Sequence, residues 1–315
     1  MDSQGRISMK LMKLRKDARA VTSAIFIVLI AVLVVSASSV AVLLYTGGEE
    51  NQGQSGNAAT KGNVVKVDYI GRLADGRVFD TSLWDVASND ALYPKSLSFT
   101  LRSQSAYTPL QFTAGMGQMI TGFDQGVMGM VEGQTKVIEV PPQEGYGSMD
   151  TSELFVMPLM VQKTVYDTMN VTEFSSIYGY VPVVGLLVQD PVYGWDVLVM
   201  EKDTNADTVM VMNKPTVSHE YAVYGEPDVI PATGWYAQVV SVDSAANSGE
   251  GLILVKNLLT DEDSGMVEGY DISKGSTFYV DMVDEAAGTY RMNYNGELLG
   301  KTLYFTVTLV DIVNT

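Results

Sequence analysis

The chain of 315 residues contains no cysteine and a single histidine, His219. The absence of cysteine excludes a disulfide framework, thiol catalysis and cysteine-ligated metal sites. One histidine forms no cluster, so we expect no metal and no other cofactor, and His219 is expected to be a solvated loop residue. Basic residues are also few, 20 against 37 acidic ones, which gives a net charge of −17. Such a chain repels phosphates, so nucleic acid is not an expected partner.

One long stretch without charge follows a basic amino terminus. Residues 21–45 carry no charged side chain and exceed the roughly 20 residues that a helix needs to cross a bilayer. Residues 1–20 contain six basic and two acidic side chains, and positive flanks stay in the cytoplasm. We therefore expect a basic cytoplasmic segment (1–20), one transmembrane helix (21–45) and a flexible linker (46–62). The protein is predicted to lie in the cell membrane as a single-pass protein with its C-terminal domain extracellular.

The run from Arg15 to Val35 also resembles the amino terminus of archaeal type IV pilins. Signals of that kind are cut just before an apolar helix, and the helix is retained. An uncleaved signal anchor and a cleaved pilin-like signal both leave a membrane-tethered outer domain, so both alternatives stay open.

A central stretch predicts strand, turn, short helix, turn and strand. Apolar residues alternate with polar ones over residues 110–112 and form a further strand pattern over residues 137–140, while they recur at helical spacing over residues 120–128. Gly126 and Gly129 are expected to let another surface approach this helix closely.

Three segments in one order resemble the FKBP-type peptidyl-prolyl isomerases. The first, VKVDYIGRLADGRVFDTS (65–82), matches the opening strands of that family. The second, residues 109–147, carries the pattern F-x-x-G-x-x-x-x-I-x-G-F-x-x-G and ends in Tyr-Gly, and the third, LYFTVTLVDI (303–312), matches the closing strand. The resemblance implies an α+β fold, with an FKBP-like antiparallel sheet wrapped on a short helix, over residues 63–147 plus 294–315.

Two features place the chain among the longer members that it resembles. The loop 81–107, in which we expect a helical turn, and the lead-in from Tyr107 to Leu110 are similar to archaeal long-type members. Residues 148–293 stand where the flap normally follows Tyr-Gly. A long insertion in the flap is typical of SlyD-type members, which carry a chaperone domain there, and NGELLGKTLYF (295–305) resembles their re-entry pattern.

The insertion contains an internal repeat, Tyr178–Pro215 and Tyr224–Leu259. Each copy has Tyr-Gly, then Gly-Trp with Trp195 or Trp235, then two alternating apolar strands around a polar turn. We therefore expect a β-rich insertion of two modules. A short helix capped by Thr172 is predicted before them. Ten of the 17 methionines lie here, which fits either a promiscuous binding surface or the filling of small irregular cores.

The resemblance also assigns a site, whose chemistry is rotation about an X-Pro amide with a barrier of about 18–20 kcal/mol. No bond is broken, so the site needs a dry pocket that binds the twisted amide best rather than a nucleophile or a base. The resemblance implies four catalytic residues. Tyr69 and Phe79 would be aromatic walls, Asp80 the polar group near the twisting amide, and Tyr146 the hydroxyl donor to the substrate carbonyl. The implied substrate-binding residues are the pocket sides, a backbone amide donor and the floor under the proline ring: Leu110, Met119, Ile120, Phe123 and Phe305. The best-known members have Trp where Phe123 stands, and Phe is smaller and lacks the N–H.

The sequence thus favours a membrane-anchored peptidyl-prolyl cis-trans isomerase with chaperone activity. It is expected to act as a monomer on unfolded or proline-containing polypeptides outside the cell. Two alternatives remain: a non-catalytic holdase chaperone, and a pilin-like surface subunit with an FKBP-like head.

Overall fold

The computed structural model describes residues 58–228 and 232–313. Among these residues no helix is long and apolar enough to span a bilayer. The predicted transmembrane helix (21–45) and the basic segment (1–20) lie outside the described residues, as does all but the end of the predicted linker (46–62).

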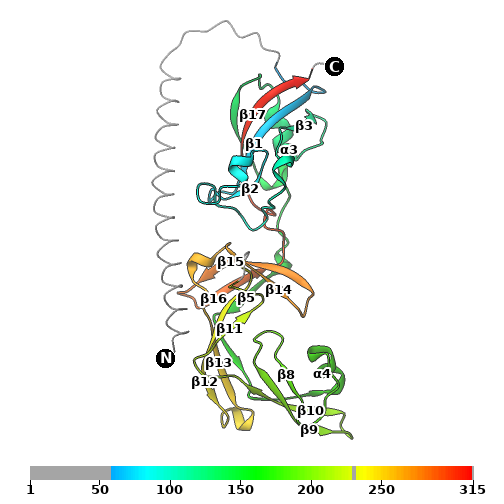
Figure 1. Cartoon of the computed structure of the whole chain (residues 1–315), viewed down its shortest axis with the longest axis vertical. Coiled ribbons are helices and arrows are strands. Elements are labelled where there is room, and N and C mark those ends of the chain that lie inside the picture. The colour runs from blue at the N-terminus through cyan, green and yellow to red at the C-terminus, as the bar shows by residue number, and fades with distance from the viewer. Residues whose placement is uncertain (1–57, 229–231, 314–315) are drawn as a thin grey trace. The chain divides into compact units, whose positions relative to one another are not determined.

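The first sheet has five strands, all paired antiparallel, and includes the closing strand β17 drawn in red in Figure 1. β1 (Val64–Arg72) pairs with β17 (Leu303–Val313), β2 (Val78–Thr81) and β3 (Leu110–Thr113), and β4 (Thr135–Val140) pairs with the other side of β17. Every second residue of β1 is buried, because successive side chains of a strand point to opposite faces. The strands and helix predicted for the central stretch are confirmed, as are the opening and closing strands.

The short helix α3 (Thr121–Val127) packs Phe123 and Val127 into the apolar core of this sheet. A Cβ atom on Gly126 would lie 2.5 Å from the side chain of Ile138 on β4, so the expected close approach at Gly126 is confirmed. The expectation for Gly129 is wrong, because a Cβ atom there would meet nothing within 4 Å. Gly129 has a φ of +80°, and it is the turn after the helix that requires a glycine.

Short helices occupy the loops around the sheet. The expected helical turn in the loop 81–107 is α2 (Trp84–Ala87), and the 3-10 turn η1 (Gln104–Ala106) follows in the same loop. A second 3-10 turn, η2 (Pro142–Glu144), stands between β4 and Tyr146.

The insertion consists of three four-stranded antiparallel sheets of one topology. In each, three consecutive strands are joined by an edge strand from the first part of the insertion. The β8–β10 module comprises β8 (Leu187–Gln189), β9 (Asp196–Asp203) and β10 (Thr208–Lys214) with β7 (Tyr166–Asn170). The β11–β13 module comprises β11 (Glu220–Val223), β12 (Trp235–Asp243) and β13 (Leu252–Asn257) with β6 (Met160–Lys163). The β14–β16 module comprises β14 (Val267–Asp271), β15 (Ser276–Asp284) and β16 (Thr289–Asn293) with β5 (Leu154–Pro158).

Two of these sheets are the predicted repeat. Trp195 Nε1 donates to Asn213 Oδ1 at 3.0 Å, and Trp235 Nε1 donates to Asn257 Oδ1 at 2.8 Å. The middle strand of each sheet has a bulge at the corresponding place, next to Met200 and Val240. The matching positions show that the same local structure occurs in both modules.

The prediction of two modules is wrong, since the β14–β16 module is a third. It shares the bulge, here at Asp281, but Gly275-Ser276 stands where the other two modules have Gly-Trp. Buried Asn293 of this module donates to the hydroxyl of Tyr279 at 2.9 Å. Without Gly-Trp, the third copy loses the pattern by which the other two are detected.

The predicted short helix is α4 (Val171–Tyr178), but its cap is not Thr172. The side-chain oxygen of Asn170 accepts a hydrogen bond from Glu173 N at 2.7 Å, which is the usual N-cap contact. Gly179 ends the helix with a φ of +75°.

Candidate functional site

Aromatic rings from five elements meet on the buried face of the five-stranded sheet. Phe123 of α3 lies at the centre: its ring centroid is 4.9 Å from that of Phe305 on β17, 5.9 Å from that of Tyr69 on β1 and 5.8 Å from that of Phe112 on β3. Phe79 of β2 contacts Phe305 edge to face at 5.4 Å. The rings cross at steep angles, the arrangement that aromatic quadrupoles favour.

The structure therefore brings together the residues that the resemblance assigns to the walls and floor. Leu110, Met119 and Ile120 are half-buried and pack against the same core. All five assigned substrate-binding residues thus border one aromatic cluster, and Met119 and Ile120 do so from the segment that leads into α3.

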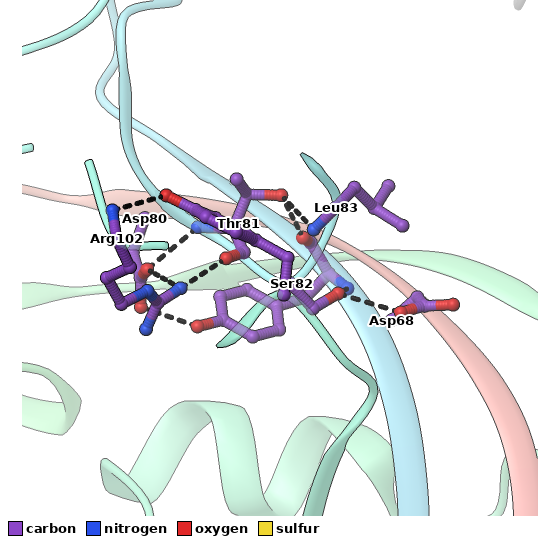
Figure 2. A network of polar contacts seen from close by, with 8 residues as sticks. Asp68, Asp80, Thr81, Ser82, Leu83 and Arg102 are labelled. Carbon is purple, nitrogen blue, oxygen red and sulfur yellow. Dashed lines mark hydrogen bonds and ion pairs between the residues drawn. The ribbon is translucent and has the colours of Figure 1, made fainter. Parts of the chain in front are cut away.

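Asp80 is held by two side chains at the edge of this cluster. The Tyr69 hydroxyl donates to Asp80 Oδ2. The Arg102 guanidinium donates to Asp80 Oδ1 at 3.1 Å and to the carbonyl of Thr81 at 2.6 Å, as Figure 2 shows. The carboxylate has 43% of its side-chain surface exposed, so it faces the site while its orientation is fixed.

Thr81 and Ser82 lock the strand that carries Asp80 onto β1. Thr81 Oγ1 donates to the carbonyl of Tyr69 at 2.7 Å, and Ser82 Oγ donates to Asp68 Oδ1 at 2.8 Å while accepting from Tyr69 N at 2.9 Å (Figure 2). Both residues are buried, and a buried hydroxyl requires such partners. The sequence prediction treated them only as the start of a loop.

Arg102 is itself positioned by Tyr107. Its backbone N–H donates to the Tyr107 hydroxyl at 3.0 Å, and its guanidinium lies 4.9 Å from the centre of the Tyr107 ring. The Tyr107 ring in turn contacts Trp84 at 5.5 Å between ring centroids. The long loop 81–107 therefore delivers a cation to Asp80 through a cation–π and aromatic stack.

The start of α3 offers a backbone donor. Ile120 is the N-cap of the helix, and within the described part of the chain no group accepts a hydrogen bond from its N–H. The first amides of a helix lack partners inside the helix and point outward from its end. The Ile120 amide is thus free to donate to a carbonyl of a bound peptide.

Asp124 fixes the segment before that amide. Its buried carboxylate accepts hydrogen bonds from Gly115 N at 2.7 Å and from Gly117 N at 2.8 Å. Both glycines have a positive φ, so the loop has a backbone that other residues adopt only with strain. The carboxylate therefore sets the path of the chain into Met119 and Ile120.

Tyr146 stands at the mouth of the site rather than in the aromatic cluster. It is half exposed, and its hydroxyl forms no hydrogen bond with any described residue. Partial burial, and then the negative charge of Asp80, raise the pKa of the Tyr146 phenol. The hydroxyl stays protonated at neutral pH and is available as a donor near Asp80.

Two groups that contact Asp80 also have shifted pKa values. Burial, followed by the hydrogen bond to Asp80 and its charge, raises the pKa of Tyr69. Burial by itself lowers the pKa of Arg102, but the charge of Asp80 and the interactions with Tyr107 and Tyr69 together outweigh it, so the pKa is raised. The site thus has a neutral phenol, a carboxylate partner and a permanent cation in one chain of contacts.

Sequence reasoning missed two residues of the site, Arg102 and Asp124. Arg102 lies in an irregular loop with no spacing pattern, so no signal marks it. Asp124 had one: an acidic residue in the first turn of a helix that follows Gly-x-Gly is placed to accept from those amides. Within the described ranges, no group of three or more His, Asp or Glu side chains is arranged to hold a metal ion.

Comparison with known proteins agrees with this geometry. Residues 55–163 match the model of FKBP-type peptidyl-prolyl cis-trans isomerases. A short-type peptidyl-prolyl cis-trans isomerase from Methanocaldococcus jannaschii is 39% identical over 94 residues, which are 30% of this chain and 54% of that protein. Human peptidyl-prolyl cis-trans isomerase FKBP2 is 36% identical over 87 residues, which are 28% of this chain and 46% of that protein.

A similar match is found to FK506-binding protein 2 of Yarrowia lipolytica, at 37% identity over 89 residues, 28% of this chain and 47% of the relative. The chain thus spans about half the length of the curated relatives it matches. A solved structure titled "Crystal structure of AtFKBP13" aligns with 30% of this chain and 64% of its own at 29% identity, with a TM-score of 0.22.

A cluster of aromatic rings thus lies between an antiparallel sheet and one short helix, beside a carboxylate that Tyr69 and Arg102 hold. The sequence of this domain is similar to that of FKBP-type peptidyl-prolyl isomerases over residues 55–163. The matched region ends at residue 163, whereas β17 returns after the insertion to complete the sheet.

Proposed function

We propose that this chain is a membrane-anchored FKBP-type peptidyl-prolyl cis-trans isomerase with chaperone activity, which assists the folding of extracytoplasmic proteins. The observation that carries the catalytic part is the aromatic cluster: the rings of Phe123, Tyr69 and Phe305 lie together beside the fixed carboxylate of Asp80. It lies in a domain whose sequence matches a family of prolyl isomerases.

The pocket lowers the rotation barrier by binding the twisted amide more tightly than the planar forms. Amide resonance creates the barrier of about 18–20 kcal/mol, and an apolar environment favours the less delocalised, twisted state. The proline ring packs on Phe123, and the Ile120 amide holds a neighbouring carbonyl. Tyr146 donates to the substrate carbonyl, and Asp80, fixed by Tyr69 and Arg102, sets the polar side of the pocket.

A protease-coupled assay of a proline-containing tetrapeptide tests the catalytic part. The purified chain is expected to accelerate cis–trans exchange, and Phe79→Ala, which empties part of the pocket beside Phe305, is expected to lose most of the acceleration. An inactive wild-type chain that still prevents aggregation of an unfolded protein would instead identify a holdase.

The membrane part rests on the uncharged residues 21–45 and the six basic residues before them. External protease added to whole cells is expected to remove the C-terminal domain. Protection in whole cells with cleavage only after lysis would reverse the orientation. Cleavage of the chain near Ala20 with assembly into filaments would favour a pilin-like subunit over a monomeric anchored enzyme.

The chaperone part rests on the insertion, which stands in the flap position as in the SlyD-type members that the chain resembles. A linked second site would raise the local concentration of a client at the pocket. The chain is expected to suppress aggregation of a chemically unfolded protein at near-stoichiometric ratios, measured by light scattering.

A further inference from the structure

The β8–β10 module carries an apolar surface that its own core does not use. No residue from Phe174 to Gln189 is charged. Six large apolar side chains of this run are between 41 and 71% exposed: Ile177, Tyr180, Val181, Val183, Val184 and Leu187. The run extends from the second half of α4 through the following loop to the end of β8 (Figure 1). We refer to these six residues as the β8 surface.

The β8 surface is held in place by the strand beside it. Gly185 N donates to the carbonyl of Val199 at 2.9 Å, and Val199 N donates to the carbonyl of Leu186 at 2.9 Å. Lys202 Nζ donates to the carbonyl of Pro182 at 3.2 Å. Because the backbone is fixed, the exposed side chains form a preformed binding surface, which spares a ligand the cost of ordering it.

The surface continues into a free strand edge. β8 is at one end of the sheet order β7-β10-β9-β8 and pairs only with β9 among the described strands. Asp190 N donates to the carbonyl of Trp195, and Val199 N to that of Leu186. In an antiparallel ladder the residues alternate, so Leu187 and Gln189 direct their backbone groups away from β9. An edge of this kind is a template for one more strand.

The negative charge of the module indicates which kind of molecule binds to the β8 surface. The module's residues 164–218 carry seven acidic and two basic side chains, and the whole chain has a net charge of −17. Two copies of the chain therefore repel each other, and an acidic peptide is disfavoured. A lipid surface would cover the apolar side chains but would not use the free strand edge.

We propose that the β8 surface binds an extended, apolar segment of an unfolded polypeptide, uncharged or basic, which adds to β8 as a strand. This inference rests on the chaperone part of the proposed function and names where a client binds and of what chemistry it is. The client's apolar side chains cover Val181, Val184 and Leu187, and its backbone pairs with the outward groups of β8.

The test uses the full chain in detergent micelles and two short fluorescein-labelled peptides of alternating valine and threonine, one with lysine at both ends and one with glutamate. Fluorescence anisotropy is expected to show tighter binding of the lysine peptide. The double variant Val181→Glu/Val184→Glu is expected to lower the affinity for the lysine peptide about tenfold or more, since burial of each valine by the peptide contributes a factor of about ten to the affinity. The control Ile272→Glu changes an equally exposed side chain, 63% against 64% for Val184, and is expected to bind as the wild type does.

A second pair of variants tests strand addition. Gln189→Pro removes one outward N–H and is expected to weaken binding, whereas Gln189→Ala keeps that N–H and is expected to have no effect. Circular dichroism checks that each variant is folded. Equal binding by the Val181→Glu/Val184→Glu variant and the wild type would overturn the proposal. The proposal would also be overturned if the β8 surface bound only zwitterionic vesicles, or only a second copy of the chain, and neither labelled peptide.

The tetrapeptide assay distinguishes failure of the β8 proposal from failure of the proposed function. All four variants are expected to keep wild-type isomerase activity on a tetrapeptide, because none of them changes a residue of the aromatic cluster or of its polar surroundings. An active isomerase that does not bind either labelled peptide refutes the β8 surface alone, while a chain inactive in both assays refutes the proposed function.

Discussion

Replacing Asp124 tests whether the loop before Ile120 is positioned by one buried carboxylate. The carboxylate accepts from two amides, at 2.7 and 2.8 Å, and hydrogen bonds to a charged group contribute about 1.5–3 kcal/mol each. Gly117 is exposed, so water replaces part of its bond after substitution. We expect Asp124→Ala to lower the free energy of unfolding by about 2–4 kcal/mol, and Asp124→Asn, which retains one acceptor, by about half as much.

The effect on catalysis follows from geometry. A misplacement of about 1 Å at a binding group can cost up to 100-fold in rate, so release of the loop before the Ile120 amide is expected to lower kcat/KM about tenfold in Asp124→Ala and less in Asp124→Asn. Urea unfolding measures the first quantity, and the tetrapeptide assay, run where all variants are folded, measures the second. Glu139→Ala removes an exposed carboxylate on β4 and serves as the control. An Asp124→Ala variant that is destabilised but fully active when folded would refute a role in positioning.

Four further expectations follow. Tyr146→Phe removes one neutral hydrogen bond, worth about 0.5–1.5 kcal/mol, and should slow tetrapeptide isomerisation about three- to tenfold; an unchanged rate would exclude the hydroxyl as a donor. Replacing residues 148–293 by a short flap should leave the tetrapeptide rate within a few fold but reduce catalysis of proline-limited refolding much more, and equal losses would contradict a division of labour. Asn213→Ala leaves a buried Trp N–H without its acceptor and should lower the free energy of unfolding by about 2–4 kcal/mol in urea titrations. Burial raises the pKa of Tyr178 and of Tyr279 to about 12. The free energy of unfolding should therefore be constant below about pH 10 and fall from there towards pH 12, because these phenols lose their protons at lower pH in the unfolded chain than in the folded one. Urea midpoints that do not change over this range would contradict this expectation.

The fold of the five-stranded domain is predictable because its signals are local. Alternation over residues 110–112 and 137–140 and helical spacing over residues 120–128 correspond to β3, β4 and α3. The aromatic residues of the pocket come from these elements and from β1, β2 and β17, each with its own strand pattern. Once the elements are in the family's order, the burial of Phe123 against Tyr69 and Phe305 follows.

The parts of the site that were not predicted depend on irregular backbone. Arg102 reaches Asp80 from a loop 22 positions later in sequence, and its direction is set by Tyr107, which no periodicity links to it. Thr81 and Ser82 are polar residues after a strand, a pattern that indicates a loop, yet both are buried because their hydroxyls bond to Tyr69.

The insertion was under-predicted because its edge strands pair with distant partners. β5, β6 and β7 follow one another within residues 154–170, and they pair with β16, β13 and β10. The three edge strands thus come first in the sequence, and the three modules that they complete follow in the reverse order. Asn213 and Asn257 join the two halves, since each carboxamide also donates to a carbonyl of the incoming segment, at Thr164 and Leu159.

This nested order has a consequence for folding. Only residues 171–207 separate β7 from its partner β10, whereas residues 159–288 separate β5 from its partner β16 (Thr289–Asn293). The cost of closing a loop grows with its length, and contacts that are distant in sequence form late. We therefore infer that the β8–β10 module forms first and the β14–β16 module last. Since β17 follows β16 and lies between β1 and β4, the aromatic cluster, which includes Phe305 of β17, is completed only after the insertion has been made.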